Sequence, residues 1–274
     1  MAVPPRILTD TLIHTQKDLA DVEAYSFAGG RAAAFTRRSP FKQTVNEDAL
    51  ALIPAGADAG VLVVADGLGG LPAGEAASRL AVQRLSEAVR AAQRNNAALR
   101  DAILNGIEQA NREIIALGGG SATTIAVVEL QGRLMRSYHV GDSLILVTGQ
   151  RGKVKYQTMP HSPVGYAVES GMLDESEALH HAERNIVSNV IGSPEMRIDI
   201  GPTFALAPRD TLLLASDGAP DNLYIRELVD CIRAGSLRRI GRELAARCHE
   251  RMHHPRAGVP SHPDDLSFIL YRPR

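Results

Sequence analysis

The chain has 274 residues, 45% of them hydrophobic, which is enough to bury a substantial core, and we expect a lead segment at residues 1–24 followed by one domain at residues 25–274. Thirty basic against 31 acidic side chains give a formal net charge of -1, so neither a nucleic-acid partner nor an acidic disordered tail is indicated. Residues 1–27 lack the apolar core of a signal peptide, and no apolar stretch approaches the ~18 to 20 residues that span a bilayer, so no membrane partner is expected. The two cysteines lack metal-ligand spacing, so we expect buried thiols. The expected protein is a cytoplasmic monomer.

The part of the chain that follows the lead segment is predicted to contain a hairpin and two helices. Residues 48–53 and 61–65 are β-prone runs separated by turn-forming residues, which predicts two antiparallel strands. Residues 73–92 favour helix. A second helix is expected to start at Asn95 or Asn96, as its cap, and to run to Leu117, because its apolar residues form one stripe and three glycines follow it.

Strands dominate the second half, with helices near its end. Residues 122–130, 133–140, 144–147 and 153–159 are joined by short connections, which predict antiparallel neighbours. Residues 160–194 break the periodicity and are interpreted as an excursion with short helices, a candidate lid. Strands at 196–200, 211–215 and 266–271 and helices at 224–234 and 237–252 complete the chain. Few βαβ units occur, so an α+β fold with antiparallel sheets covered by helices is expected.

Carboxylates recur where β-prone runs stop, so a folded sheet could bring them to one edge. Any one of them is typical of a turn, since Asp beside Gly is a preferred turn pair. Together, oxygen ligands at several strand ends suit hard divalent ions such as Mg²⁺ or Mn²⁺ better than structural zinc. Two such ions about 3.5 to 4 Å apart can deprotonate a shared water and neutralise a phosphate, which predicts phosphoester hydrolysis. The acidic segments are Asn46-Glu47-Asp48, Asp66, Asp142, Asp217, Asp221 and Asp264-Asp265.

Six ordered blocks carry a family resemblance: Asn46-Glu47-Asp48, Val64 to Gly70 with Gly74 to Ser78, Ala122-Thr123-Thr124, Val140 to Ser143, Ala215 to Gly218, and Asp264 to Ser267. In order and spacing the chain resembles the metal-dependent serine/threonine protein phosphatases, the PPM or type-2C family, bacterial type, over roughly residues 25–272. The resemblance implies a four-layer α-β-β-α sandwich with two central antiparallel sheets. It also implies hydrolysis of phosphoserine and phosphothreonine in proteins by a metal-activated water, at a centre of two or three Mn²⁺ or Mg²⁺ ions.

The resemblance assigns roles to individual residues. Asp66 would bridge both ions, and the carbonyl of Gly67 would bind one of them. Asp217 and Asp264 would complete one ion, and Glu47 or Asp48 would serve the other, partly through water. The catalytic set implied in this way is Asp66, Asp48 and Asp217.

Some bacterial relatives hold a third ion, and the matching ligands here are Asp142, Asp217 and Asp221. Two of these have a plainer alternative. Gly141-Asp142 could be only a two-residue hairpin loop, and Asp221-Asn222 could simply cap the helix that begins near Tyr224.

Other motif residues are expected to support the centre. Asp265 should make a hydrogen bond, because many relatives carry asparagine there. Thr123 and Thr124 should pack beside the ligands and orient them. The glycines of the second block should form a turn that lets the next helix approach the metal edge; they are Gly69, Gly70 and Gly74.

Two positions depart from the family pattern. Many relatives have an arginine where this chain has Gln43, so phosphate could instead be bound by Lys42, Arg37 or Arg38. Well-studied eukaryotic members have a histidine where this chain has Leu68, so a metal-bound water is inferred to protonate the leaving oxygen. The other candidates for that proton are three histidines of the excursion, for which solvated loop side chains are the commoner explanation: His161, His180 and His181.

Two other functions are possible alternatives. A phosphoprotein-binding or scaffolding module could keep this fold without turnover, and Gln43 favours it, but the full set of carboxylates argues against it. A two-metal hydrolase of nucleotides or nucleic acid is disfavoured by the neutral charge and by the lack of tryptophan or a basic, aromatic-rich strand. The expected partners are therefore phosphorylated proteins, in a pathway that contains an opposing serine/threonine kinase.

Overall fold

The computed structural model describes residues 6–68, 73–178, 181, 183 and 186–274. Its strands form two seven-stranded sheets, antiparallel throughout except where β1 pairs parallel with β3. The first sheet has the order β1 (Arg6–Ile7), β3 (Glu23–Phe27), β4 (Gly30–Arg37), β14 (Leu266–Pro273), β13 (Thr211–Ala215), β9 (Leu144–Thr148) and β10 (Val154–Gln157). The second sheet has the order β11 (Asp199–Ile200), β8 (Leu134–Val140), β7 (Ile125–Gln131), β6 (Ala59–Ala65), β5 (Ala49–Pro54) and β2 (Leu12–Thr15), with β12 (Phe204–Ala205) also paired to β8.

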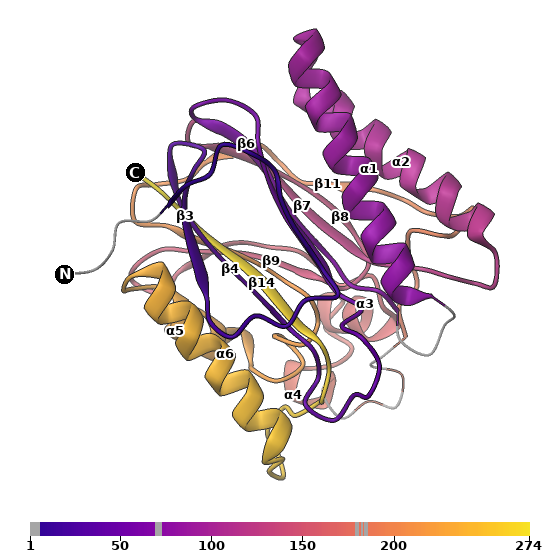
Figure 1. Ribbon diagram of the computed structural model, residues 1–274. Coiled ribbons are helices and arrows are strands. Elements are labelled where there is room, and N and C mark those ends of the chain that lie inside the picture. Colours follow the sequence, from indigo (N-terminus) through magenta and orange to yellow (C-terminus); the bar gives the residue numbers. More distant parts are fainter. Residues whose placement is uncertain (1–5, 69–72, 179–180, 182, 184–185) are drawn as a thin grey trace.

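Helices cover the outer face of each sheet. Helices α1 (Gly74–Asn95) and α2 (Leu99–Leu117) lie on the second sheet, and α5 (Ile225–Ile232) and α6 (Leu237–His253) lie on the first, as Figure 1 shows. Three apolar layers result: one between the sheets and one beneath each helix pair. The predicted four-layer α-β-β-α sandwich is confirmed. Cys231 of α5 and Cys248 of α6 are buried free thiols, as predicted.

The N-terminal strands were not predicted. Strands β1 and β2 lie within the expected lead segment, and β2 pairs with β5 in the second sheet. Strands β3 and β4 form a hairpin, and β4 pairs along its length with β14. The division into a lead at residues 1–24 and a domain at 25–274 stays a prediction.

Two local expectations were wrong. Helix α2 is not capped by asparagine: its cap is Ala98, whereas Asn96 adopts a left-handed conformation, with φ of 51°, and ends α1. Asparagine is one of the residues that tolerate this conformation at a helix end. The predicted strand at 196–200 is reduced to β11, because its first residues lie outside the β8 pairing.

The short link between β8 and β9 does not make a hairpin. Strand β8 belongs to the second sheet and β9 to the first, so residues 141–143 cross from one sheet to the other. Gly141 allows this crossing, with φ of 105°, and a Cβ atom there would lie 2.5 Å from the Cβ of Thr124. The connection therefore carries Asp142 along the open end of the sandwich.

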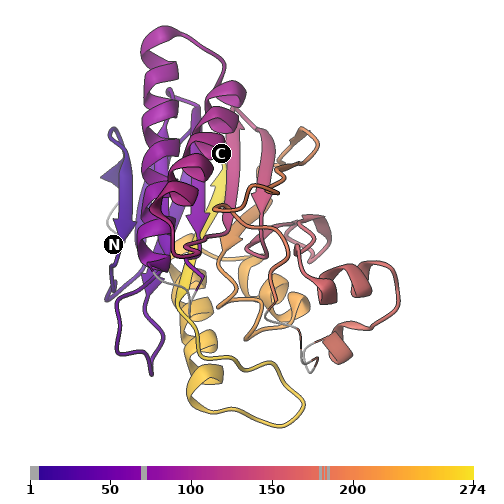
Figure 2. The same ribbon diagram turned by 90° about the vertical axis from the view of Figure 1, so that its right-hand side faces the viewer.

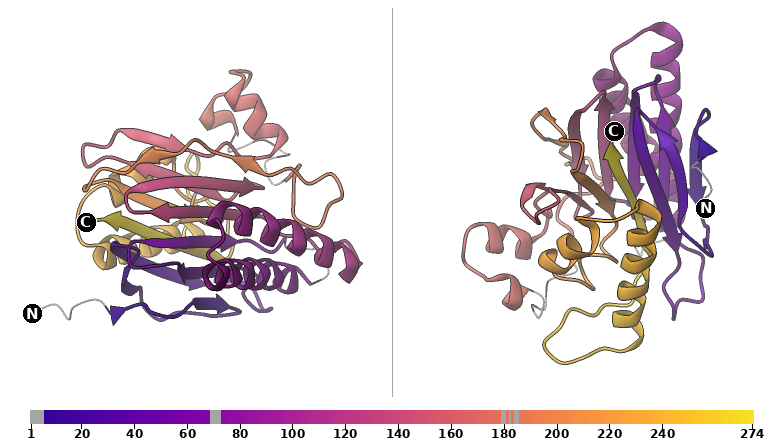
Figure 3. Two further views of the ribbon diagram at one scale, coloured as in Figure 1. Left: turned by 90° about the horizontal axis from the view of Figure 1, so that it is seen from above. Right: turned by 90° about the vertical axis from the view of Figure 1, so that its left-hand side faces the viewer.

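The excursion after β10 contains two short helices, as predicted: α3 (Pro163–Glu169) and α4 (Glu175–Ala178). Figures 2 and 3 show them projecting from the side of the sandwich. The lid function stays a prediction, and His180, Arg184, Asn185, Gly69 and Gly70 lie outside the described residues. None of the helices within the described ranges combines the length and apolar character that a bilayer crossing requires.

Candidate metal centre

The predicted carboxylates converge at one end of the sandwich because their strands start or stop there. In the second sheet Ala49 pairs with Ala65, so Asp48 and Asp66 leave neighbouring strands at the same edge. In the first sheet Ala215 pairs with Phe268, which brings the segments of Asp217 and Asp264 together. The crossing at residues 141–143 adds Asp142 to this end.

A direct hydrogen bond joins the two sheets at this end. Ser216 Oγ donates to Asp48 Oδ2 at 2.8 Å and accepts from the backbone N–H of Ser267 at 3.0 Å. Asp48 N–H donates to Asn46 Oδ1, so a short local turn fixes the backbone of Asp48. Ser216 is fully buried, and Asp48 is almost so. The position of Asp48 relative to the first sheet is thus set by contacts inside the protein.

The carboxylates raise one another's pKa values. Burial is the largest cause for Asp66, and the charges of Asp48, Asp264 and Asp142 add to it, so its pKa lies well above the usual range. The pKa of Asp217 is raised in the same way by burial and then by Asp66 and other carboxylates. A hydrogen bond with Asp217 partly offsets the rise at Asp66.

The remaining carboxylates follow the same pattern. Burial and the charge of Asp265 raise the pKa of Asp48 to about 7. Burial and the charge of Asp264 raise the pKa of Asp142 to about 6. The pKa of Asp264 is itself raised, first by burial. Mutual repulsion of this kind is relieved when a cation lies among the charges.

The donor set fits hard cations. Two carboxylate oxygens in the described part of the chain, Asp48 Oδ1 and Asp217 Oδ1, are buried without a hydrogen-bond partner. Such oxygens are costly to bury unless something pairs with them. No three acidic, imidazole or thiol side chains among the described residues already form a closed ligand cage. Mg²⁺ does not need a closed cage of protein ligands, because it typically binds through one or two carboxylates and keeps several waters.

Glycines bring the next helix against these residues. Gly67 N–H donates to the carbonyl of Glu47 at 3.3 Å, and Ser78 of α1 donates to the same carbonyl at 2.5 Å. A Cβ atom on Gly74 would lie 2.9 Å from Leu68 O and 3.1 Å from Glu47 Oε1. The glycine at the start of α1 therefore permits the close approach that was predicted for it.

Lys42 forms an ion-paired bridge that the sequence did not reveal. Its Nζ binds Glu47 Oε2 and lies 2.7 Å from Asp265 Oδ2. Asp265 also accepts from the backbone N–H groups of Ser39 and Glu47, each at 2.7 Å, which confirms its supporting role. Burial opposes the charge on Lys42, but the hydrogen bonds to Asp265 and Glu47 outweigh it and raise the pKa of Lys42.

The two arginines offered as phosphate ligands are engaged elsewhere. Arg37 donates to the carbonyls of Leu19 and Ala20 and lies over the ring of Phe35. Arg38 donates to the carbonyl of Thr44. Of the three basic candidates, Lys42 is therefore the one that contacts a predicted metal ligand.

Asp221 does not cap α5. The backbone N–H at the start of that helix, on Tyr224, donates to Glu227 instead, at 3.1 Å. The neighbouring Asn222 is fully buried and joins two loops: its Nδ2 donates to the carbonyls of Gly218 and His262, and its Oδ1 accepts from the N–H of His262. Asn222 thus holds the loop of Asp217 against the loop that leads to Asp264.

Thr123 and Thr124 orient the backbone of Asp66. Thr123 Oγ1 donates to the Asp66 carbonyl at 2.7 Å, and Asp66 N–H donates to Thr124 Oγ1 at 3.2 Å. Thr124 Oγ1 also contacts Ser143 Oγ, which lies next to Asp142, at 2.6 Å. The predicted supporting role of both threonines is confirmed.

His161 is not a solvated loop side chain. It is buried, its Nδ1 accepts from the N–H of Gly141 at 3.0 Å, and its Nε2 contacts Asp199 Oδ2 at 2.9 Å. Asn189 Nδ2 also lies 2.9 Å from His161 Nδ1. The backbone N–H of Glu183 donates to His181 Nδ1 at 3.2 Å. His161 therefore fastens the start of the excursion to the crossing that carries Asp142.

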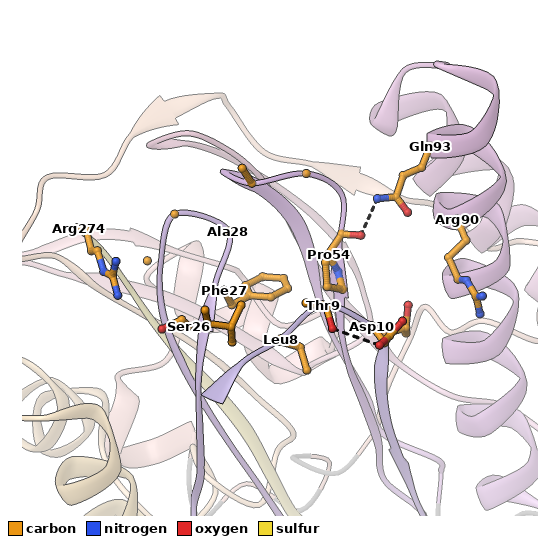
Figure 4. Close-up of a pocket in the computed structure, with 16 residues that line it drawn as sticks. Leu8, Thr9, Asp10, Ser26, Phe27, Ala28, Pro54, Arg90, Gln93 and Arg274 are labelled. Carbon is orange, nitrogen blue, oxygen red and sulfur yellow. Dashed lines mark hydrogen bonds between the residues drawn. The ribbon is translucent and has the colours of Figure 1, made fainter. Parts of the chain in front are cut away.

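A hollow of about 860 Å³ lies at the end of the sandwich opposite the carboxylates, beyond Pro54, where β5 ends. Figure 4 shows Phe27 and Arg90 on its walls, with Gln93 Nε2 donating to the Pro54 carbonyl at 2.7 Å. None of the predicted ligands is among the described residues that line it. This hollow is therefore separate from the predicted metal ligands.

Comparison with known proteins agrees with this geometry. Residues 40–254 match the family described as Protein phosphatase 2C. Protein phosphatase PhpP of Streptococcus pneumoniae is 32% identical over 199 residues, which cover 70% of this chain and 80% of PhpP. The S. agalactiae serine/threonine phosphatase is 27% identical with a TM-score of 0.74, over 89% of this chain and 99% of that one.

Stp1, a serine/threonine phosphatase from Staphylococcus aureus, is 26% identical with a TM-score of 0.75, over 89% of this chain and 94% of Stp1. The family match spans well over half of the present chain and includes most of the convergent carboxylates. On these grounds the chain belongs to the protein phosphatase 2C family of metal-dependent protein serine/threonine phosphatases.

Proposed function

We propose that this phosphatase hydrolyses phosphoserine and phosphothreonine at a binuclear Mn²⁺ or Mg²⁺ centre that admits a third ion. Asp66 would be a ligand of both ions. The further ligands proposed are Glu47, Asp48, Gly67 through its carbonyl, Asp217 and Asp264, with Asp142, Asp217 and Asp221 for the third ion. The catalytic residues in the narrow sense are Asp66, Asp48 and Asp217.

The observation that carries this proposal is the pair of buried carboxylate oxygens without partners, Asp48 Oδ1 and Asp217 Oδ1, one from each sheet. Both side chains belong to a cluster whose members raise one another's pKa values. An uncompensated cluster of this kind opposes folding, so its concentration at one end of the sandwich supports a cation-binding role.

The chain's own residues can be assigned definite tasks. Divalent ions, when bound, lower the pKa of a shared water and offset the charge of the phosphate. Ser216 holds Asp48 in place by its hydrogen bond, and Thr123 and Thr124 fix the backbone of Asp66. These contacts set the ligand positions before substrate arrives, which lowers the reorganisation that the reaction requires.

Lys42 is the proposed phosphate contact in place of the arginine that is absent at Gln43. Its ammonium group lies between Asp265 and the proposed ligand Glu47. A lysine acts as a point charge and does not form the bidentate contact of an arginine. Arg37 and Arg38 remain weaker candidates, because their guanidinium groups bind backbone carbonyls.

The proposed setting is a cytoplasmic monomer that acts on phosphorylated proteins opposite a serine/threonine kinase. The near-zero net charge supports the absence of a nucleic-acid partner.

The test is turnover of a phosphothreonine peptide by Asp66→Asn with Mn²⁺ present. We expect kcat/KM to fall by more than about 100-fold, because the bridging charge is lost while the side chain keeps its size. Asp101→Asn, an exposed carboxylate on α2, is the matched control and should leave turnover unchanged. Near-normal turnover by folded Asp66→Asn would contradict the proposal, and absence of Mn²⁺-dependent hydrolysis of para-nitrophenyl phosphate by the unaltered protein would favour the scaffolding alternative.

A further inference from the structure

A hollow of about 510 Å³ opens beside the carboxylates, between α3 of the excursion and the start of α5. Asp142, Asp217 and Asp221 form its inner wall. We call it the α3–α5 hollow. Its volume falls within the range of pockets that bind small ligands, so it can hold one or two amino-acid side chains.

Most of the remaining lining of the α3–α5 hollow is apolar, and the polar residues on it are Gln157, Thr158 and Ser162. The large apolar and aromatic residues of the lining are Met159, Val164, Val168, Leu223, Tyr224 and Ile225. The charged residues on its described lining are all acidic: the three aspartates and Glu169, which lies at the exposed rim. An acidic substrate side chain would be repelled here, whereas an apolar one would leave water for an apolar surface.

Both walls are held in place by contacts inside the protein. On one side, Ser162 caps α3 by accepting from the N–H of Gly165 at 2.9 Å, and Ser188 N–H donates to the carbonyl of His161 at 2.8 Å. On the other side, Tyr224 OH donates to the carbonyl of Gly258 at 3.0 Å, and Leu223 is almost fully buried. A preformed wall orders fewer groups on binding, which favours affinity.

We propose that the α3–α5 hollow binds an apolar side chain of the substrate protein close to the phosphorylated residue, and that it gives the enzyme a preference for phosphosites with such a neighbour. The inference rests on the proposed function, since the hollow is continuous with the proposed ligands Asp142, Asp217 and Asp221. A peptide whose phosphate is bound at the proposed centre would place the side chains next to the phosphorylated residue near this hollow, because Asp142, Asp217 and Asp221 line it. The class of substrate is therefore a phosphoserine or phosphothreonine segment with leucine, isoleucine, methionine or phenylalanine nearby.

The test compares short phosphothreonine peptides in a glycine-serine host. Leucine is placed singly at each of the three positions before and after the phosphothreonine, and kcat/KM is measured with Mn²⁺ against the unsubstituted host. At one or more positions leucine should raise kcat/KM by about tenfold, as expected for a side chain that fills an apolar pocket. Aspartate and lysine at the same position should give no such gain.

Variants connect the preference to the hollow. Val168→Asp places a charge on the α3 wall and should reduce the leucine-to-glycine ratio of kcat/KM to about one, while the smaller change Val168→Ala should reduce it part of the way. Ile115→Asp is the matched control, because Ile115 is an apolar side chain that is 42% exposed on α2, and it should keep the full ratio.

Three outcomes overturn the inference: no leucine position gives a gain, lysine gives the same gain as leucine, or folded Val168→Asp keeps the full ratio. Para-nitrophenyl phosphate separates this failure from that of the proposed function, since it has no flanking side chain. Mn²⁺-dependent hydrolysis of that ester without any leucine preference rejects the α3–α5 hollow alone, whereas loss of the hydrolysis itself rejects both.

Discussion

Replacing Asn222 by alanine should destabilise the protein and weaken its hold on Mn²⁺. Asn222 is fully buried, and its amide makes three hydrogen bonds: to Gly218 O at 3.0 Å, to His262 O at 2.7 Å, and from His262 N–H at 2.9 Å. Each such bond contributes about 1 kcal/mol, and the carbonyls and N–H left behind are buried or half-buried. We expect the free energy of unfolding to fall by about 2–4 kcal/mol.

The same substitution should loosen the proposed centre, because Asn222 joins the loop of Asp217 and Asp221 to the loop that leads to Asp264. Supporting groups of this kind typically alter metal affinity by about 10- to 100-fold. Urea unfolding followed by circular dichroism measures the stability, and calorimetric titration with Mn²⁺ measures the affinity.

Asn105→Ala is the control for this experiment. Asn105 is exposed within α2, where alanine favours helix, so its replacement should be neutral or slightly stabilising. Our reasoning about the two loops is refuted if Asn222→Ala unfolds within about 0.5 kcal/mol of the unaltered protein, the size of an ordinary surface change.

Gly141→Ala should destabilise the protein by more than Gly120→Ala. Both glycines have positive φ, but only at Gly141 would the added Cβ lie 2.5 Å from a neighbouring side chain, that of Thr124. Equal urea midpoints for the two variants would show that the crossing tolerates a side chain. Lys42→Gln should lower kcat/KM for para-nitrophenyl phosphate by about tenfold, since one charge next to the phosphate is lost. The control Lys153→Gln, at an exposed lysine, should leave kcat/KM unchanged. An unchanged kcat/KM in Lys42→Gln would exclude Lys42 as the phosphate contact. In EDTA, stability should fall as pH rises from about 6.5 to 8: burial and neighbouring carboxylates raise the pKa values of Asp66 and Asp217 well above their usual range and that of Asp48 to about 7, so the folded state holds protons that the unfolded state has released, and this stabilisation is lost as pH rises through the folded pKa values. Saturating Mn²⁺ should abolish that fall, and urea midpoints that rise with pH in EDTA would contradict the predicted effect.

Two buried histidines act against this trend at the lower end of the pH range. Burial lowers the pKa of His139 to about 3 and that of His249 to about 4. Their unfolded pKa is about 6.5, so from about pH 4 to 7.5 the unfolded state binds protons that the folded state does not, and the two histidines make stability rise with pH, against the trend of the carboxylates. Above about pH 7.5 both are neutral in the folded and the unfolded state, and the raised pKa values of Asp66 and Asp217 set the trend.

The strong periodic elements of this fold could be predicted from the sequence, and the N-terminal strands could not. Strand β4 contains three consecutive alanines, which are poor β-formers. Its successive residues enter two different apolar layers, so its sequence does not show the alternation of polar and apolar residues that is typical of a half-buried strand. Its partner β14 lies more than 220 residues away in the chain. Strand β4 therefore forms because of its tertiary pairing with β14, which the local sequence pattern does not reveal.

The carboxylates could be predicted because each lies at the end of an apolar run, whereas their supporting partners could not. Ser216, Asn222 and Lys42 contact residues that are distant in sequence, and a single serine, asparagine or lysine carries no spacing signal. The link at residues 141–143 was misread for a similar reason: its length fits a hairpin, but length alone does not say which sheet the next strand joins. The positive φ of Gly141 is the local sign of that crossing.

The most direct test of this account is calorimetric titration of the intact protein with Mn²⁺. The account predicts uptake of at least two ions, accompanied by proton release because the raised pKa values of Asp66 and Asp217 leave protons to be displaced. Asp66→Asn should bind fewer ions and release fewer protons. No Mn²⁺ or Mg²⁺ uptake by the folded protein would contradict a phosphatase that works through cations at this end of the sandwich.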